Sequence, residues 1–338
     1  MIKFWKEHST MASVDEMVLD NRGRELTEQE LPEILSLLPS LAGKRVLDLG
    51  AGIGSIMNIH NQICWLLEKV PRSKVIQGGF STFQQFLDNR QYTRQGNLHY
   101  EKIFGAGYIS TGGFSTTKEF VDLLNLKPGQ KVLDVGCGMG GGAFYMAKTF
   151  GVEVLGLDLS ENMVEIAMER AIDEKLPMVH FELADATKRS FEEGSFDVIY
   201  SRDTILHIDD KLALFKRFHS WLRPGGQLLI SDYCCGEKPW TPSFQEYVQQ
   251  RGYILYTVKQ YGEVIEEAGF CSVRAEDRTA RLIQATQTEL DRADAIKGEL
   301  IKEFSEEDYL AIVNRWSDKL QRCDTGDQRW GLFYATKH

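Results

Sequence analysis

Long apolar runs and an excess of positive charge are both missing from this 338-residue sequence. No apolar run approaches the roughly 18 residues that a membrane helix requires, and the first residues, MIKFWKEHST, lack the apolar core of a signal peptide. Lys and Arg number 39 against 49 Asp and Glu, a formal net charge of −10. A basic face for nucleic-acid phosphates is therefore not expected. We predict a cytoplasmic protein with no membrane span and no nucleic-acid partner.

Cysteine is also sparse, and its spacing is unlike that of a metal site. The six cysteines form no CxxC pair and have no histidines at zinc-finger spacing. We therefore expect reduced thiols and no metal, and we assign no chemical role to the adjacent Cys234 and Cys235. Hydrophobic residues, by contrast, make up 43% of the chain, the share of an ordinary globular protein with a substantial core.

A repeated motif indicates two related units. VLDLGAGIG spans Val46–Gly54, and VLDVGCGMG spans Val132–Gly140. Each is typical of an apolar strand followed by a glycine turn, where the backbone can approach a ligand closely. The second motif starts only 132 − 46 = 86 residues after the first, too few for a full α/β series in between. We interpret residues 1–79 as the truncated remnant of an N-terminal unit plus a linker, and residues 80–338 as the complete catalytic domain.

The second unit alternates apolar strands with helical stretches. After the glycine motif, strands are predicted at 152–157, 179–183, 196–200 and 227–231, with a last one in RWGLFYAT. A Pro-Gly-Gly turn in WLRPGGQLLI is expected before strand 227–231. A helical stretch over 282–304 is expected to cover the sheet or the pocket. This order predicts an α/β fold with a doubly wound, mostly parallel sheet.

Acidic residues follow these strands in order. Asp134 precedes Gly136 by two positions, where it can orient the loop and the amino end of a ligand. Asp158 ends the next strand, where the ribose hydroxyls of a nucleotide lie in such sheets. Asp185 follows the third strand, at a position suited to an adenine edge. The glycine spacing followed by Asp158 also fits NAD, so the loop alone leaves the nucleotide open.

The ordered set of strand-end acids resembles the class I S-adenosylmethionine-dependent methyltransferases. That resemblance implies a Rossmann-like fold, with a mostly parallel seven-stranded sheet and helices on both faces, and S-adenosyl-L-methionine as the cofactor. The implied cofactor-binding residues are Ile109, Ser110, Asp134, Gly136, Gly138, Asp158, Leu159, Asp185, Ala186 and Arg202.

Longer motifs resemble the phosphoethanolamine N-methyltransferases of plants, nematodes and malaria parasites. The motifs are QYTRQGNLHYEKIFG, YISTGGFSTTKEF, YSRDTILHI, ISDYC, EYVQQRGY and QRWGLFYATK, within residues 80–338. These enzymes methylate phosphoethanolamine stepwise to phosphocholine, and plant forms carry two units in tandem. Residues 80–338 resemble the second unit, which completes the last two methylations, and residues 1–54 resemble the start of the first. The resemblance thus implies phosphomethylethanolamine and phosphodimethylethanolamine as substrates and leaves phosphoethanolamine itself in doubt.

The chemistry of such a reaction requires a neutral amine. An amine of pKa near 10 is mostly protonated at pH 7, a cost of roughly 4 kcal/mol, so a base is needed. By resemblance, Tyr92 and His207 form a dyad that closes the site and relays the proton, and Asp203 lies near the amine. The resemblance also implies a set of residues that bind the rest of the substrate and its phosphate: Gln91, Tyr100, Tyr233, Tyr247, Arg251, Tyr253 and Lys319.

Three other interpretations stay open at this point. The truncated first unit is compatible with a non-catalytic product that binds the cofactor or pairs with a full-length enzyme. The domain is also compatible with a methyltransferase for another small amine, or with an NAD oxidoreductase on the evidence of the glycine loop. The sequence does not indicate an oligomeric state.

Overall fold

The computed structural model describes residues 45–46, 66–67 and 82–338. The chain divides into two units, Met1–Val75 and Ile76–His338. In the first unit, strand β1 (Arg45–Val46) pairs antiparallel with β2 (Leu66–Leu67). The rest of the first glycine motif, and the interpretation of residues 1–79 as a remnant, lie outside the described residues.

The second unit is built on a sheet of seven strands in the order β5-β4-β3-β6-β7-β9-β8. Neighbours from β5 to β7 are parallel, and β9 runs antiparallel to both β7 and β8. The strands are β3 (Lys131–Val135), β4 (Glu153–Asp158), β5 (Val179–Leu183), β6 (Phe196–Arg202), β7 (Leu222–Cys235), β8 (Cys271–Asp277) and β9 (Gln328–Thr336). This order confirms the predicted mostly parallel seven-stranded sheet.

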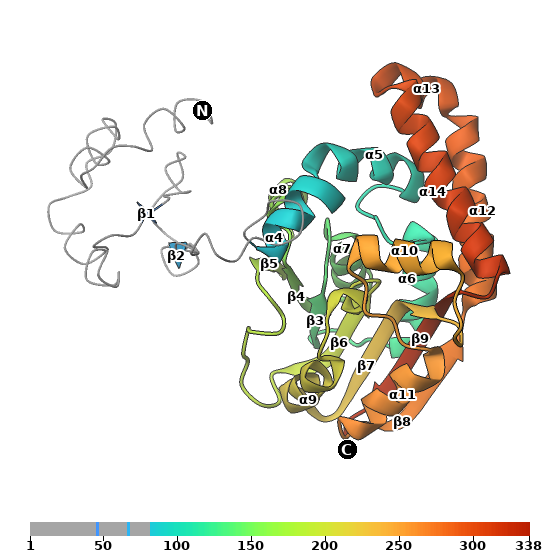
Figure 1. The fold of residues 1–338 in the computed structure, drawn as a ribbon. Coiled ribbons are helices and arrows are strands. Elements are labelled where there is room, and N and C mark those ends of the chain that lie inside the picture. Colours follow the sequence, from blue (N-terminus) through green and yellow to red (C-terminus); the bar gives the residue numbers. More distant parts are fainter. Residues whose placement is uncertain (1–44, 47–65, 68–81) are drawn as a thin grey trace, which may run out of the picture. The chain divides into compact units, whose positions relative to one another are not determined.

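Helices cover both faces of this sheet. One core cluster joins the sheet to α6, α7, α8, α12 and α14, and the other joins it to α9 and α11. Figure 1 shows α5 and α10 above the sheet, and α12, α13 and α14 beside it, projecting past its upper edge. The helices are α4 (Phe83–Phe86), α5 (Arg94–Phe104), α6 (Gly113–Val121), α7 (Gly141–Phe150), α8 (Glu161–Glu174), α9 (Lys211–Trp221), α10 (Pro242–Arg251), α11 (Val258–Glu267), α12 (Thr279–Ala295), α13 (Lys297–Glu303) and α14 (Glu306–Asp324). Shorter turns are the π-helix η2 (Leu87–Gln91) and the 3₁₀ turns η3 (Asp122–Leu124) and η4 (Ile205–His207).

Side-chain caps in the sequence fix where several helices begin. The side-chain oxygens of Ser160, Asp210 and Thr241 each accept a bond from the backbone N–H three residues on. Thr257 and Gln260 form a reciprocal capping box at the start of α11. Such caps satisfy backbone donors that would otherwise lack partners. They fix the residues at which α8 and α10 begin.

Three features differ from the sequence prediction. The Pro-Gly-Gly segment is a bulge inside β7, because between the pairs Phe196↔Leu222 and Val198↔Gln227 strand β6 advances two residues and β7 five. Strand β8 was not predicted, since its half-exposed, charged sequence CSVRAED lacks the apolar character of the inner strands. The helical stretch predicted over 282–304 is present, but it divides at Ile296 into α12 and α13.

Glu289 of α12 ties the outer helices to the loop before α6. Its carboxylate, only 4% exposed, accepts from the backbone N–H of Gly112 at 2.5 Å and from Trp316 Nε1 of α14 at 2.5 Å. A buried carboxylate with two donors is stabilising, whereas donors left without it are costly. Among the described residues, no helix is long and apolar enough to cross a bilayer.

We expect Glu289→Ala to lower the stability of the folded chain by roughly 2 to 4 kcal/mol, because two buried donors lose their acceptor. Glu289→Gln keeps one acceptor oxygen and should lose less. Thermal unfolding of both variants checks this order, with the exposed Glu267→Ala as the matched control. Equal melting temperatures for Glu289→Ala and Glu267→Ala would contradict the proposed tie.

Candidate active site

The carboxyl ends of the parallel strands open into a cavity of about 870 Å³. Glycine and acidic residues come from β3 and β4 and the turns after them, while basic and aromatic residues come from α10, α14 and β7. Every site residue named from the sequence lines this cavity: Gln91, Tyr92, Tyr100, Ile109, Ser110, Asp134, Gly136, Gly138, Asp158, Leu159, Asp185, Ala186, Arg202, Asp203, His207, Tyr233, Tyr247, Arg251, Tyr253 and Lys319. The structure brings these residues together, and their individual roles stay predictions.

The glycine turn after β3 is held by the neighbouring strand. Backbone N–H groups of Gly136 and Cys137 donate to Leu157 O at 2.7 and 3.0 Å, and Gly138 N donates to Asp158 Oδ2 at 2.8 Å. Gly136 has a φ of 76°, and a Cβ there would lie 2.0 Å from Thr204 Oγ1. A side chain at this position is therefore excluded both by the backbone conformation and by space.

Two buried carboxyl groups flank this turn. Burial raises the pKa of Asp134 to about 7, and the neighbouring Asp158 adds to the rise. Burial likewise raises the pKa of Asp158 to about 6, against the backbone N–H groups of Ser160 and Gly138, which lower it. Both shifts show that this end of the cavity favours added positive charge or hydrogen-bond donors.

Asp185, the third strand-end acid, is bonded to neighbouring residues of its own loop. Asp185 Oδ1 accepts from the backbone N–H and hydroxyl of Thr187 at 2.9 and 2.6 Å, and Oδ2 pairs with Lys188 Nζ at 2.8 Å. Burial alone would raise the pKa of Asp185, but the bonds from Lys188 and Thr187 hold it below its usual value. Its carboxylate is thus fixed at the mouth of the cavity beside the buried Ala186.

Arg202 proves to be a structural anchor as well as a lining residue. Its guanidinium donates to Thr111 O and Thr116 Oγ1, both at 2.9 Å, and to Thr117 Oγ1 at 2.7 Å. The group is 6% exposed and lies against the rings of Phe120 and Trp330. These bonds hold segment 111–117 against β6, and the position of Arg202 beside the cofactor, which the resemblance implies, stays a prediction.

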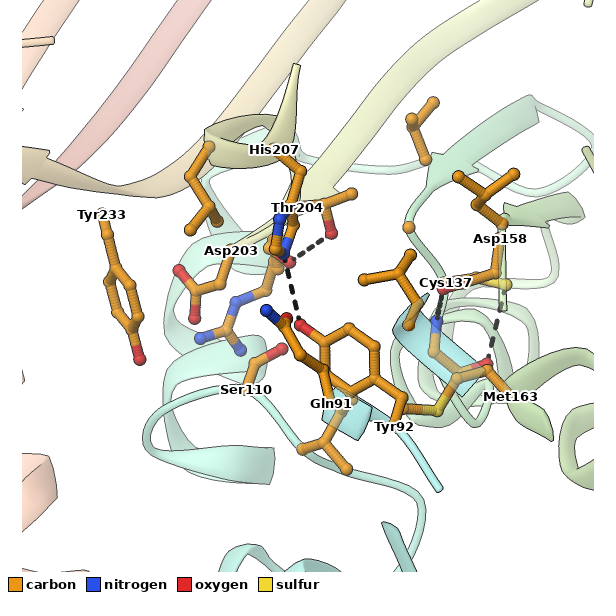
Figure 2. A pocket seen from close by; sticks show the side chains of 18 of the residues that line it. Gln91, Tyr92, Ser110, Cys137, Asp158, Met163, Asp203, Thr204, His207 and Tyr233 are labelled. Atoms are coloured by element: carbon orange, nitrogen blue, oxygen red, sulfur yellow. Dashed lines mark hydrogen bonds between the residues drawn. The ribbon is translucent and has the colours of Figure 1, made fainter. Parts of the chain in front are cut away.

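Tyr92 and His207 meet across the cavity. Figure 2 shows them joined by a hydrogen bond, 3.4 Å between Tyr92 Oη and His207 Nε2, with Asp203 and Tyr233 to one side and Asp158 to the other. Burial lowers the pKa of His207 to about 3, and the charges of Lys211 and Arg251 act in the same direction. Burial raises the pKa of Tyr92 above its usual value. Both groups are therefore neutral at pH 7, and His207 Nδ1 has no partner in the described part of the chain.

Lys211, which the sequence analysis did not single out, supports the turn that carries His207. Its ammonium, 1% exposed, donates to the carbonyl oxygens of Ile205 and Ile208, each at 2.7 Å. Burial lowers the pKa of Lys211 to about 8, against the buried carboxylate of Asp232, which raises it. The lysine thus fixes the position of η4 at the base of the site.

Asp203 lines the cavity, and one of its two carboxylate oxygens has no hydrogen-bond partner among the described residues. Its Oδ1 accepts from Trp330 Nε1 at 2.8 Å, while Oδ2 is buried without a partner among the described residues. The backbone of Asp203 has a φ of 50°, a left-handed conformation that is uncommon outside glycine and often marks functional sites. Trp330, from the strand predicted in RWGLFYAT, is fully buried and thus belongs both to the core and to this contact.

Four basic side chains gather at the other end of the cavity. Arg315, Lys319 and Arg322 lie on one face of α14, and Arg251 ends α10. Lys319 is 9% exposed and lies 5.6 Å from the centre of the Tyr233 ring. None of the four forms an ion pair with a carboxylate anywhere in residues 82–338. This end of the cavity is therefore suited to an anion.

Tyrosines hold these cations in place. Arg322 stacks on Tyr247 with its guanidinium carbon 3.8 Å from the ring centre, Arg251 lies 6.0 Å from the same ring, and Arg315 donates to Tyr100 Oη. The sequence analysis named Arg251 and Lys319 but missed Arg315 and Arg322. Their spacing around Lys319 on a single helix was the available signal.

Burial alone would lower the pKa of Lys319, but neighbouring Tyr233 and Glu289 outweigh that effect and hold its pKa above the usual value. The ammonium therefore keeps its charge at neutral pH.

No group of His, Cys, Asp and Glu residues in the described ranges is arranged to hold a metal ion.

Comparisons with known proteins agree with this arrangement. A family described as "Methyltransferase domain" matches residues 132–226, the segment from the glycine turn to the bulge in β7. The fold and this match place the chain in the class of proteins with a methyltransferase domain. The phosphoethanolamine N-methyltransferase of Plasmodium falciparum is 40% identical over 256 residues, which cover 75% of this chain and 96% of that protein. The chain belongs to the phosphoethanolamine N-methyltransferase family.

Longer relatives and a solved structure give the extent of the match. Phosphoethanolamine N-methyltransferase 1 of Zea mays is 56% identical over 290 residues, 84% of this chain and 56% of that protein. The chain thus spans about half the length of the curated plant relatives that it matches. A solved structure of phosphoethanolamine N-methyltransferase 2 from Haemonchus contortus contains phosphomonomethylethanolamine and S-adenosylhomocysteine. It aligns with this chain at a TM-score of 0.74 and 39% sequence identity, and the alignment covers 76% of this chain and 60% of that one.

The raised pKa of Asp134 predicts that this residue lowers the stability of the folded chain at high pH. Between pH 3.8 and about 7 the unfolded chain releases a proton that folded Asp134 retains, so this group's contribution to stability falls as pH rises through that window. We expect Asp134→Asn to raise the melting temperature of the ligand-free chain by a few degrees at pH 8 and by less at pH 5.

Thermal scans at both pH values check this expectation, with the exposed Asp173→Asn on α8 as the control for a lost surface charge. A pH-independent difference between Asp134→Asn and the native chain would contradict it.

Proposed function

We propose that this chain catalyses S-adenosylmethionine-dependent N-methylation of phosphobases. Phosphomethylethanolamine and phosphodimethylethanolamine are converted to phosphocholine, and phosphoethanolamine itself is a poor substrate or none. The observation that carries this proposal is the polarity of the cavity, which is lined both by Asp203, with one carboxylate oxygen lacking a hydrogen-bond partner, and by four basic residues that have no carboxylate partner within residues 82–338. A zwitterionic phosphobase matches that arrangement. The ligands of the Haemonchus contortus structure support it.

The residues around the glycine turn fit the cofactor. Asp134, buried at 3% exposure and with a raised pKa, is suited to the cationic amino group of a methionine moiety. Asp158 is fixed by Gly138 N and Ser160 N and is suited to ribose hydroxyls. Leu159 and Ala186 would line the adenine, and Ile109 and Ser110 the methionine end. When bound, S-adenosylmethionine supplies an electrophilic methyl group on a sulfonium.

The neutral dyad is suited to receiving the amine's proton. His207 is an uncharged imidazole with a ring nitrogen that can accept a proton, and Tyr92 is an uncharged phenol. Burial and the charges of Lys211 and Arg251 lower the pKa of His207 to about 3, so without the acceptor it is a weak base. The free Oδ2 of Asp203 would hold the ammonium form beside them before the proton leaves. Arg251 lowers the pKa of His207, and a phosphate dianion bound at Arg251 removes part of that effect. The base therefore strengthens when the acceptor is in place.

The basic residues would bind the phosphate. Charge-assisted contacts to an anion are worth roughly 1.5 to 3 kcal/mol each, and Arg presents two parallel donors to phosphate oxygens. Arg251 and Lys319 are the primary candidates, with Arg322 supporting them through Tyr247. Gln91 donates to Arg251 O at 3.2 Å and so links the segment before Tyr92 to this end of the cavity.

The domain assignment is part of the proposal. We infer that residues 80–338 form the catalytic domain and that residues 1–79 are the remnant of a first unit plus a linker. The resemblance of 80–338 to the second unit of plant enzymes supports this division. A cytoplasmic location, supported by the five free cysteines of the described chain, also stays a prediction.

Identification of products with each of the three phosphobases tests the substrate assignment. We expect methyl transfer to phosphomethylethanolamine and phosphodimethylethanolamine, ending at phosphocholine, with none or little to phosphoethanolamine. His207→Asn is the matched inactive variant, and its rate should fall by roughly a hundredfold or more, as expected for a general base.

Robust turnover of phosphoethanolamine would refute the inference that truncation of the first unit removes the first methylation. Binding of S-adenosylmethionine and phosphobase by calorimetry without any transfer would instead favour a non-catalytic chain. Transfer to small amines that lack a phosphate would refute the phosphobase assignment.

Removing single cations tests the phosphate end. We expect Arg251→Ala and Arg322→Gln each to raise the KM for phosphobase about tenfold or more while changing the KM for S-adenosylmethionine little. Arg251→Ala loses a charge-assisted contact, and Arg322→Gln loses the cation that stacks on Tyr247 and supports Arg251. The exposed Lys216→Gln on α9 controls for the loss of one positive charge. An unchanged KM for phosphobase in Arg251→Ala would rule out this anion site.

A further inference from the structure

Tyr92 lies outside regular secondary structure, and its position depends on side chains of other segments. Its carbonyl oxygen accepts from Asn162 Nδ2 at 2.9 Å and from Asn97 Nδ2 at 3.1 Å. The same Asn162 amide donates to the carbonyl oxygen of Asp88 at 3.0 Å. A single side chain of α8 therefore holds both ends of the segment from Asp88 to Tyr92.

The carboxylate of Asp88 is fastened to the same helix. Its Oδ1 accepts from Ser160 Oγ at 2.5 Å and from the backbone N–H of Asn162 at 3.5 Å, and its Oδ2 accepts from the backbone N–H of Glu161 at 3.3 Å. These donors form the N-terminus of α8, where a negative charge is stabilised by the helix dipole. Asp88 thus adds a second cap, from a segment 72 residues away, to the cap that Ser160 provides.

These contacts continue into the cofactor end of the cavity. The backbone N–H of Ser160 donates to Asp158 Oδ1 at 2.9 Å, and Asp158 Oδ2 accepts from Gly138 N at 2.8 Å. A continuous chain of hydrogen bonds thus leads from the glycine turn through Asp158, Ser160 and Asp88 to the Asn162 amide. That amide also bonds the carbonyl oxygen of Tyr92. In Figure 2, Tyr92 lies between Met163 of α8 and His207.

The segment also contacts the acceptor end directly. Phe83 lies with its ring centre 5.7 Å from that of His207, Tyr92 Oη reaches His207 Nε2, and Gln91 donates to Arg251 O. Residues 87–91 form a π-helix, a rare geometry that occurs frequently at functional sites. Segment 83–92 therefore touches both α8 on the cofactor side and His207 and Arg251 on the acceptor side.

We propose that Asp88 and Asn162 are positioning residues that couple the two halves of the site. Cofactor bound at Asp158 orders the start of α8, and the bonds of Asp88 and Asn162 carry that order to Tyr92, which closes over the acceptor. The acceptor is then bound more tightly when the cofactor end is filled. This inference rests on the proposed function, because it requires both ligands to bind.

Calorimetry on the full chain tests the coupling without turnover. The Kd of phosphodimethylethanolamine is measured alone and with saturating S-adenosylhomocysteine, for the native chain and for Asp88→Ala and Asn162→Asp. We expect the second ligand to tighten binding at least about fivefold in the native chain, in the range of allosteric couplings. In both variants we expect less than about twofold tightening, since the linking bonds are lost.

Control measurements separate positioning from a general structural defect. Asn162→Asp has the size of Asn162 but no donor, so it tests the bonds with little change in packing, and it carries the test if Asp88→Ala does not fold. Asp173→Asn, an exposed site on the same helix, should keep the native coupling. We expect the Kd of S-adenosylhomocysteine alone to change less than about threefold in all variants, whereas a merely structural defect would weaken it together with the phosphobase.

The outcomes distinguish this inference from the proposed function. Native-like tightening in Asn162→Asp, or no tightening in the native chain while both ligands bind, overturns the coupling and leaves the function standing. If the native chain binds neither ligand, the proposed function fails and the coupling fails with it.

Discussion

The structure depends on keeping opposite charges apart within one cavity. Asp134 and Asp158 lie at the glycine turn, and Asp203 lies on the side of Tyr233. Arg251, Lys319 and Arg322 line the same cavity without forming an ion pair with any of these carboxylates. Buried charges that lack a partner are costly, so the protein supports each with neutral donors, aromatic rings or backbone groups. The free energy spent in this way becomes available when a ligand of matching polarity binds.

The supports around these charges come from distant parts of the chain. Trp330 of β9 holds one oxygen of Asp203 and leaves the other free, Lys211 fixes the turn that carries His207, and Arg202 ties segment 111–117 to the sheet. Each of these groups is itself almost fully buried. Loss of any of them would therefore disturb both the packing of the sheet and the chemistry at its edge.

The sequence predicted the parts of the site that follow from local pattern. Asp134 and Asp158 each end an apolar strand, and parallel strands bring their carboxyl ends to one edge, so their convergence was foreseeable. The meeting of Tyr92 and His207 required the family resemblance, since nothing local links residues 115 positions apart. The contact between Trp330 and Asp203 joins residues 127 positions apart, and no pattern in the sequence indicated it.

Tertiary pairing also overrode a strong local signal. Pro-Gly-Gly predicts a turn, but β6 pairs on one side, and on the other Gly225 N and Gly226 O bond to the backbone of Lys337 at 2.8 and 2.9 Å. The segment is therefore carried within β7 as a bulge, because β6 pairs with Leu222 before it and Gln227 after it, while Lys337 bonds the backbone of its glycines. Arg315 and Arg322, by comparison, were missed although their spacing around Lys319 on α14 was visible.

Helices α12, α13 and α14 are all inserted between β8 and β9, two strands that pair directly with each other. Strands β3 to β6 supply none of the three cations of α14, which are Arg315, Lys319 and Arg322. Substitutions within the inserted segment α12–α14 can thus change selectivity for the acceptor while leaving the strands at the nucleotide end of the cavity unchanged.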